Sequence, residues 1–270
     1  MIRLVAFDLD GTLIGPDTVL RPRVERAIAE TQARGIEITL ATGRKFSATR
    51  PFAERLGITA PLICYQGGWI QAPGDAAPLY RVPLPEAVTL EVLALSASEG
   101  WHTILYADGE VFLDEVRYAE DFYRALLGET FAVGVPWREA LASRAADKVL
   151  FAAEPDAIPA MGARLRARLG DRAEVVRSHA RFVEVIPADV SKGRALAWLS
   201  AHLEIAQSAV MAVGDQENDL AMVRWAGVGV AMGDAVPELR RAADWVAPSW
   251  RDDGAAVALA RFVLERAASP

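Results

Sequence analysis

Two acidic segments, far apart in the sequence, each follow a short apolar run. Asp8–Asp10 comes directly after Leu4–Phe7. Asp215–Asp219 comes one glycine after Ala209–Val213. Such apolar runs are typical of buried strands in a parallel sheet, whose ligands bind outside the carboxyl ends of the strands. If the two strands are neighbours, several like charges converge, so a cation must lie between them. Carboxylate oxygens favour Mg²⁺, which commonly bridges a protein to a phosphate.

Each acidic segment also has a simpler structural explanation. Asp10-Gly11 is a common hairpin signal, but Pro16, Pro22 and a helical pattern follow instead of a pairing strand. Asp and Asn are good helix N-caps. A cap accounts for one carboxylate of the second segment and leaves the others unexplained. The two segments together therefore favour chemistry over a turn or a cap.

Two further segments could bind an anion. The apolar run Ile36–Ala41 leads into Thr42-Gly43-Arg44, which offers a hydroxyl, free backbone N–H groups and a guanidinium. Ser191 opens a helical pattern that places Lys192 in the first turn, where the helix dipole disfavours a cation. A neighbouring anion would compensate that placement. A strand-to-helix turn at Thr42 and a solvated surface lysine at Lys192 are the alternatives.

The elements that must position these side chains are a parallel sheet and its helices. Helical patterns separate a series of strand-like apolar runs, which predicts an α/β fold with a doubly wound parallel (Rossmann-like) sheet core. The predicted strands are Leu4–Phe7, Ile36–Ala41, Leu62–Tyr65, Ala209–Val213, Gly227–Ala231 and Trp245–Ala247. We expect the Ala-rich tail Ala255–Ala268 to form a closing amphipathic helix.

A stretch of different pattern interrupts this alternation between Pro83 and Pro187. The prolines at both ends of this stretch suit linkers better than the interiors of helices or strands. The sequence therefore predicts a catalytic core of residues 1–83 and 187–270 and an inserted α+β cap of residues 84–186. Within the cap we expect strands at Thr103–Ala107, Val111–Leu113, Lys148–Ala152 and Phe182–Ile186, and helices at Glu86–Ser98 and Asp156–Leu169.

The four segments, in this order and at these spacings, resemble the haloacid dehalogenase-like hydrolase superfamily, and in detail its Cof-type sugar-phosphatase branch. The residues that carry the resemblance are Asp8-Leu9-Asp10-Gly11-Thr12, Ala41-Thr42-Gly43-Arg44, Ser191-Lys192-Gly193 and Gly214–Asp219. Two positions depart from that branch. Gln66-Gly67-Gly68 stands where it usually has Asn-Gly-Ala, and Asp234 stands where it has Asn.

The resemblance implies a role for each motif residue. Asp8 would be the nucleophile that forms an aspartyl-phosphate, and Asp10 the acid/base that protonates the leaving alcohol and then activates water. Thr42 and Lys192 would bind the phosphoryl oxygens. The candidate Mg²⁺ ligands are Asp8, Asp10 (through its backbone carbonyl), Asp215 and Asp219. Further phosphate- or substrate-binding candidates are Gly43, Arg44, Gln66, Gly67 and Asn218.

The expected function is Mg²⁺-dependent hydrolysis of small phosphorylated metabolites, sugar phosphates among them. The cap would supply specificity, and the candidate cap or cleft contacts are Gln66, Trp69, Lys148, His179 and Arg181. The alternative enzyme is a sugar phosphomutase, which returns the phosphoryl group to the sugar and requires a bisphosphate. A non-catalytic metabolite-binding protein would be expected to have lost a nucleophile or a metal ligand, and none is missing from the sequence.

The composition agrees with a protein of this kind. The chain has 270 residues, of which 52% are hydrophobic, enough for one large or two modest domains. Its net charge of −7 argues against nucleic-acid binding through a basic face. Cys64 is the only cysteine, no signal peptide precedes the first strand, and no apolar stretch is long enough to cross a bilayer. We therefore expect a cytoplasmic monomer or weak homodimer that binds neither nucleic acid nor membrane.

Overall fold

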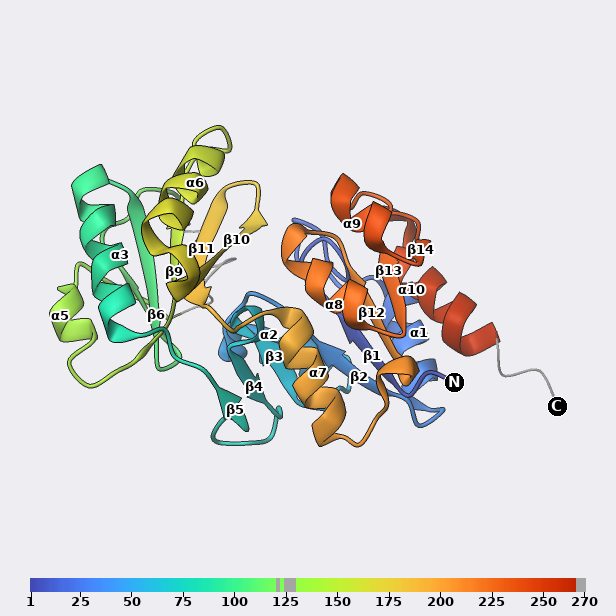
Figure 1. The fold of residues 1–270 in the computed structure, drawn as a ribbon. Helices are drawn as coiled ribbons and strands as arrows, with labels where there is room; N and C mark the ends of the chain where they lie inside the picture. Colours follow the sequence, from blue (N-terminus) through green and yellow to red (C-terminus); the bar gives the residue numbers. More distant parts are fainter. Residues whose placement is uncertain (120–121, 124–129, 266–270) are drawn as a thin grey trace. The chain divides into compact units, whose positions relative to one another are not determined.

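The computed structural model describes residues 1–119, 122, 123 and 130–265, and the chain forms two compact units (Figure 1). Unit 1 comprises Met1–Gly43, Thr49–Tyr80 and Ser191–Pro270. Unit 2 comprises Arg44–Ala48 and Arg81–Val190. Among the described residues, no helix combines the length and the apolar character that a membrane crossing requires.

Unit 1 is built on a five-stranded parallel sheet with β1 between β12 and β2. Phe7 of β1 is in register with Val213 on one side and Leu40 on the other. The strands in spatial order are β14 (Trp245–Val246), β13 (Val228–Ala231), β12 (Val210–Gly214), β1 (Leu4–Phe7) and β2 (Glu37–Leu40). The predicted α/β fold with a parallel sheet core is thus confirmed, and the carboxyl ends of β1, β2 and β12 lie at one edge.

The predicted strand Leu62–Tyr65 forms the shorter β3 (Leu62–Cys64), which ends where Tyr65 adopts a φ of +51°. An isolated parallel bridge joins Ile63 to Ala41. The hydrogen-bonded ladder of β3 belongs to a separate three-stranded sheet with β4 (Trp69–Gln71) and β5 (Tyr80–Arg81). The left-handed backbone after Cys64 turns the chain back on itself, so β3 pairs with β4 in an antiparallel ladder.

The helices of unit 1 pack on its parallel sheet and on one another. Helix α1 packs on β2 and α10, and α8 packs on β12, β13 and α7. Their bounds are α1 (Pro22–Gln32), α7 (Lys192–His202), α8 (Leu220–Trp225), α9 (Pro237–Ala242) and α10 (Gly254–Leu259); α2 (Phe46–Arg55) begins in unit 2 and ends in unit 1. The predicted tail helix is α10 followed by a π-helical turn, Ala260–Leu264, and its residues 266–268 lie outside the described residues.

Unit 2 is a six-stranded sheet in which all neighbours are antiparallel except β7 and β8. Its strands in spatial order are β10 (Ala173–His179), β11 (Phe182–Pro187), β9 (Ala146–Ala152), β6 (His102–Ala107), β7 (Glu110–Leu113) and β8 (Ala132–Val133). The strand β10 was not predicted from the sequence. Its run Ala-Glu-Val-Val-Arg-Ser-His is half polar because only part of it is buried.

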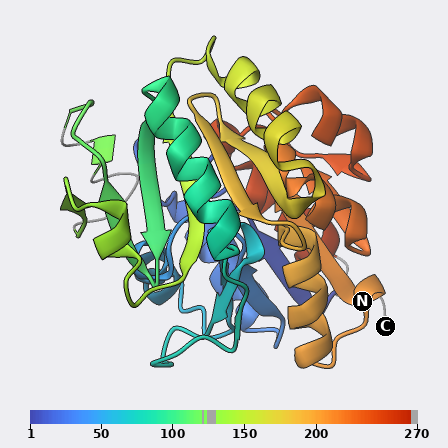
Figure 2. The same cartoon turned by 60° about the vertical axis from the view of Figure 1, so that its left-hand side comes forward.

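Two helices, α3 (Glu86–Glu99) and α6 (Ile158–Leu169), cover one face of this sheet (Figure 2). Leu105, Val149 and Val185 point from the strands into the apolar layer beneath these helices. Because side chains alternate along a strand, the residues just before or after them point to the opposite face. That face carries Tyr106, Lys148 and Glu184. The short helix α5 (Trp137–Ala140) also belongs to this unit.

On this second face, Lys148 and Glu184 form a buried ion pair. The Lys148 Nζ lies 2.6 Å from Glu184 Oε2, each side chain is 2% exposed, and the ammonium lies 4.5 Å from the centre of the Tyr106 ring. Ser178 donates its hydroxyl to the other carboxylate oxygen of Glu184. A buried pair is costly to break because the remaining charge loses the opposite charge beside it.

We expect Lys148→Met alone to lower the free energy of unfolding by about 3–5 kcal/mol. The double variant Lys148→Met/Glu184→Leu should recover most of that loss, because it removes both charges of the pair together. Urea unfolding of the two single variants and the double variant measures both effects. A double variant as unstable as the sum of the single ones would show that the two side chains act independently.

Candidate active site

Three carboxylates meet at the carboxyl edge of the parallel sheet in unit 1. Asp8 follows β1, Asp215 follows β12, and Asp219 ends the 3₁₀ turn Glu217–Asp219. Each offers one oxygen, and these oxygens all lie within 4.8 Å of one another. The three residues are at most 6% exposed, whereas Asp10 is exposed and its carboxylate is outside this group. The fold thus brings together three of the four acidic candidates.

Lys192 places a buried ammonium beside these carboxylates. Its Nζ lies 2.6 Å from Asp8 Oδ1 and 2.6 Å from Asp219 Oδ1, and the residue is 1% exposed. It is the first residue of α7, whose N-cap Ser191 accepts a hydrogen bond from the Arg194 N–H at 3.1 Å. Two carboxylates thus compensate a cation that the helix dipole disfavours. The alternative of a solvated surface lysine is therefore wrong.

The buried carboxylates and the Lys192 ammonium shift one another's pKa values. Burial raises the pKa of Asp8 well above its usual value; Asp219 and Asp215 add to this effect, and Lys192 opposes it. Burial and the nearby Asp219 raise the pKa of Asp215 to about 7. Burial also disfavours the Lys192 ammonium, but Asp219 and Asp8 outweigh it and raise the pKa of Lys192 above its usual value. Three buried carboxylates facing one ammonium suit an additional cation with a preference for hard oxygen ligands.

Hydrogen bonds hold the second acidic loop in place. Asp215 accepts from the Thr12 hydroxyl at 3.3 Å and from Gln216 Nε2 at 2.9 Å. Asp219 Oδ2 accepts from the backbone N–H groups of Asp215 at 2.8 Å and of Gln216 at 3.0 Å. Sequence reasoning assigned no role to Thr12 or Gln216. The only sign of their role in the sequence is that Thr12 follows Asp10-Gly11 and Gln216 follows Asp215.

Of the predicted phosphate- or substrate-binding residues, all but Arg44 belong to unit 1. Thr42 is 1% exposed, and its N–H donates to the Ile63 carbonyl at 2.8 Å. Gln66 Oε1 accepts from Asn218 Nδ2 at 2.9 Å, so two candidates that are far apart in the sequence are in contact. Arg44, which directly follows Gly43, is grouped with unit 2. Its positive charge opposes the rise in the pKa of Tyr106 that burial causes.

The remaining candidate contacts have partners within their own units. Trp69 donates its Nε1–H to Gln71 Oε1 at 2.7 Å and packs edge-on against Tyr65. His179 is exposed at the end of β10, with its ring 4.8 Å from that of Phe182. Arg181 pairs with Glu154 in unit 2.

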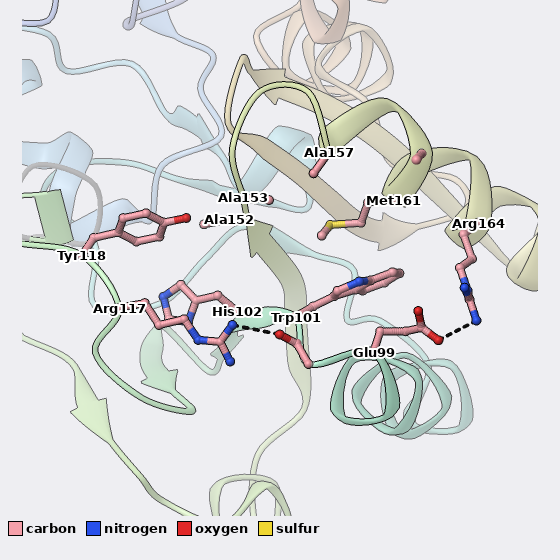
Figure 3. A pocket seen from close by; sticks show the side chains of 12 residues that line it. Glu99, Trp101, His102, Arg117, Tyr118, Ala152, Ala153, Ala157, Met161 and Arg164 are labelled. Carbon is pink, nitrogen blue, oxygen red and sulfur yellow. Dashed lines mark hydrogen bonds and ion pairs between the residues drawn. The ribbon is translucent and has the colours of Figure 1, made fainter.

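Unit 2 also contains an open cavity of about 500 Å³ (Figure 3). Its apolar lining includes Trp101 and Met161. The arginines around it form ion pairs, since Arg164 lies 2.5 Å from Glu99 and Arg117 lies 2.6 Å from Glu115. The acidic group belongs to unit 1, so this cavity is a separate feature of the molecule.

Comparison with known proteins agrees with this geometry. A family model described as haloacid dehalogenase-like hydrolase matches residues 5–259. The HMP-PP phosphatase of Cronobacter sakazakii is 33% identical over 243 residues, which cover 88% of this chain and 87% of the relative. The 5-amino-6-(5-phospho-D-ribitylamino)uracil phosphatase of Bacillus subtilis is 28% identical over 97% of this chain and 96% of the relative.

A solved structure gives the same result for the fold. The haloacid dehalogenase-like hydrolase from Bacteroides thetaiotaomicron superimposes with a TM-score of 0.81 at 25% identity, covering 97% of this chain and 99% of the other. The family model spans nearly the whole chain, both units included. With its buried acidic group and Lys192 at the edge of a parallel sheet, this chain belongs to the haloacid dehalogenase-like hydrolases.

Proposed function

We propose that this protein is a Mg²⁺-dependent phosphatase that hydrolyses small phosphorylated metabolites through an aspartyl-phosphate on Asp8. The observation that carries the proposal is the position of Lys192, whose Nζ lies 2.6 Å from both Asp8 and Asp219 in a buried acidic group. A buried nucleophile beside a fixed ammonium suits a substrate that brings its own negative charge. Relatives named as phosphatases support the same reaction class.

In the first step, a carboxylate oxygen of Asp8 attacks phosphorus and the bond to the leaving oxygen breaks. Asp10, two residues further on and exposed to the solvent, would donate a proton to the leaving alcohol. The Lys192 ammonium and Thr42 would stabilise the negative charge on the phosphoryl oxygens. Because Lys192 is held from two sides, its ammonium needs little reorganisation when that charge develops.

In the second step, water cleaves the aspartyl-phosphate, and Asp10 would take the proton from that water. Inorganic phosphate is released, and Asp8 becomes a free carboxylate again. Asp219 does not need to react in either step. Its two oxygens accept from Lys192 and from the backbone of residues 215 and 216, so it orients the ammonium and the loop.

The donor set at this edge fits a divalent metal ion. Asp8, Asp215 and Asp219 provide carboxylate oxygens within 4.8 Å of one another, and hard oxygen ligands of this kind are those that Mg²⁺ prefers. We propose that Asp8, Asp215 and the backbone carbonyl of Asp10 hold it, with Asp219 in support. When bound, Mg²⁺ would neutralise the buried negative charge and polarise the phosphoryl group.

A screen of phosphorylated metabolites for release of inorganic phosphate, with and without Mg²⁺, tests this function. The expected result is Mg²⁺-dependent release of inorganic phosphate from one class of small phosphomonoesters. Sugar phosphates are the first class to try. A positional isomer formed only in the presence of a sugar bisphosphate would instead identify a phosphomutase, and no turnover of any compound would contradict the proposal.

We further propose that residues 84–186 act as a cap that selects the substrate. The three grouped carboxylates and Lys192 lie outside this segment, so the chemistry should not depend on its sequence. Replacing residues 84–186 by the corresponding segment of the Cronobacter sakazakii HMP-PP phosphatase should change the ranking of natural substrates. Hydrolysis of the small activated ester p-nitrophenyl phosphate should persist. An unchanged substrate ranking would place specificity in the core instead.

A further inference from the structure

A strained turn follows β3 in unit 1, beside the proposed catalytic residues. Three consecutive residues, Tyr65, Gln66 and Gly67, have positive φ angles of +51°, +61° and +106°. Tyr65 and Gln66 are each 1% exposed. Residues other than glycine rarely adopt this backbone, and strain of this kind persists only where the surrounding structure enforces it. The turn therefore requires an explanation beyond reversing the chain.

One side of the turn contacts the proposed phosphate-binding segment. The Gln66 N–H donates to the Thr42 carbonyl at 3.1 Å. Its side-chain amide lies against Gly43 so closely that a Cβ at position 43 would be 2.4 Å from Gln66 Nε2. The backbone and the side chain of Gln66 thus both contact the segment Thr42–Gly43.

The other side of the turn contacts the start of α7. A Cβ at Gly67 would lie 2.4 Å from the Ser191 carbonyl oxygen, so only glycine permits this approach. That carbonyl accepts the Ala195 N–H at 3.0 Å and is part of the first turn of the helix. Since Lys192 directly follows Ser191, the position of this turn constrains the helix that carries the ammonium.

The Gln66 side chain also reaches the acidic loop. Its Oε1 accepts from Asn218 Nδ2 at 2.9 Å, and Asn218 directly precedes Asp219. Asn218 Oδ1 is buried and accepts no hydrogen bond from any residue that the structure describes. With its Nδ2 directed to Gln66, Asn218 keeps a carbonyl oxygen for a donor that the described chain does not supply.

We propose that Gln66 is a positioning residue of the active site. The turn Tyr65–Gly67 joins three segments that are far apart in the sequence: Thr42–Gly43, the start of α7 with Lys192, and Asn218–Asp219. The inference rests on the proposed function of these segments and adds the residue that keeps them in one geometry. The donor for Asn218 Oδ1 would be a water or a substrate hydroxyl bound at this edge, because both carry O–H groups.

The test variant is Gln66→Leu, which keeps the bulk of the side chain and removes both the acceptor and the donor of its amide. We expect kcat to fall about 10- to 100-fold, because misplacement of groups around a reacting phosphate is costly. Inhibition by orthovanadate should weaken by a similar factor. Mg²⁺ affinity should stay close to that of the wild type, because the variant leaves the Asp8 and Asp215 carboxylates, which we propose as ligands, unchanged.

Gln71→Leu is the matched control. Gln71 is a buried glutamine of the same unit, 4% exposed, with its own hydrogen bonds to Trp69 and to the Asp75 carbonyl. Its loss should lower the melting temperature without changing kcat or vanadate inhibition. Gln66→Asn restores an amide that tolerates a positive φ and should recover part of the lost kcat.

The outcomes separate this inference from the proposed function. If the wild type releases no phosphate from any substrate, the proposed function is wrong. If the wild type is active and Gln66→Leu keeps its kcat and vanadate inhibition, the positioning role is wrong. Equal losses of kcat in Gln66→Leu and Gln71→Leu would also overturn it, because they would reflect general loss of packing. A product alcohol that inhibits the wild type more strongly than Asn218→Leu identifies a substrate hydroxyl as the donor to Asn218, and equal inhibition identifies water.

Discussion

Asp8→Asn is expected to abolish turnover while the protein stays folded. The amide has nearly the same shape as the carboxylate, but it cannot attack phosphorus or carry a negative charge toward a metal ion. Lys192 keeps its 2.6 Å contact with Asp219, so the ammonium does not lose all compensation. We expect kcat to fall at least ~1,000-fold. Steady-state kinetics with the best substrate of the screen measures the loss.

At alkaline pH, Asp8→Asn should be more stable than the wild type, although it is less active. The pKa of Asp8 is raised in the folded protein, chiefly by burial, so folding favours the protonated form. The stability that this proton provides is present below the unfolded-state pKa and is lost as pH rises through the folded-state pKa. The metal-free Asn variant should therefore unfold at a higher temperature than the metal-free wild type at alkaline pH.

Asp75→Asn, an exposed carboxylate in unit 1, is the control for Asp8→Asn. It should leave both kcat and the melting temperature unchanged. Residual activity of more than a few per cent in Asp8→Asn, relative to the wild type, would remove Asp8 from the role of nucleophile.

Removal of the metal ion is expected to abolish phosphatase activity, and Asp215→Ala should reproduce most of that loss. Chelation leaves three buried carboxylates facing a single ammonium. The Ala variant removes one of the proposed ligands, so we expect at least about a 100-fold loss of kcat/KM that excess Mg²⁺ restores only in part. Activity is measured against Mg²⁺ concentration. Full activity after exhaustive chelation would refute the metal requirement.

The affinity for Mg²⁺ should also depend on pH. In the metal-free protein burial and Asp219 raise the pKa of Asp215 to about 7, so a proton competes with the ion at slightly acid pH. Calorimetric titration should give tighter binding at about pH 8 than at about pH 6, with protons released on binding. Asp234→Ala, which removes an exposed carboxylate of the same unit outside the acidic group, should keep the wild-type pH dependence. An affinity that is the same at both pH values would contradict competition between a proton on Asp215 and the ion.

The sequence by itself determined the parallel core and the residues that could take part in a reaction. Leu4–Phe7 and Ala209–Val213 are recognisable as strands because every residue in β1 and nearly every residue of the second run is buried, which makes the runs uniformly apolar. The acidic segments stand out because carboxylates directly after such strands have no packing role. Strand β10 was missed because its partial burial leaves a mixed pattern that local periodicity does not reveal.

Only the tertiary structure decided which candidates meet. Asp8, Lys192 and Asp219 are separated by up to 211 residues in the sequence, and their contact depends on β1 lying between β12 and β2. The same holds for Gln66 and Asn218, which touch because a left-handed turn follows β3. Local sequence patterns predict neither of these two sets of contacts. Strand order and backbone strain result from long-range packing, which compensates the cost of burying like charges and of holding residues at positive φ.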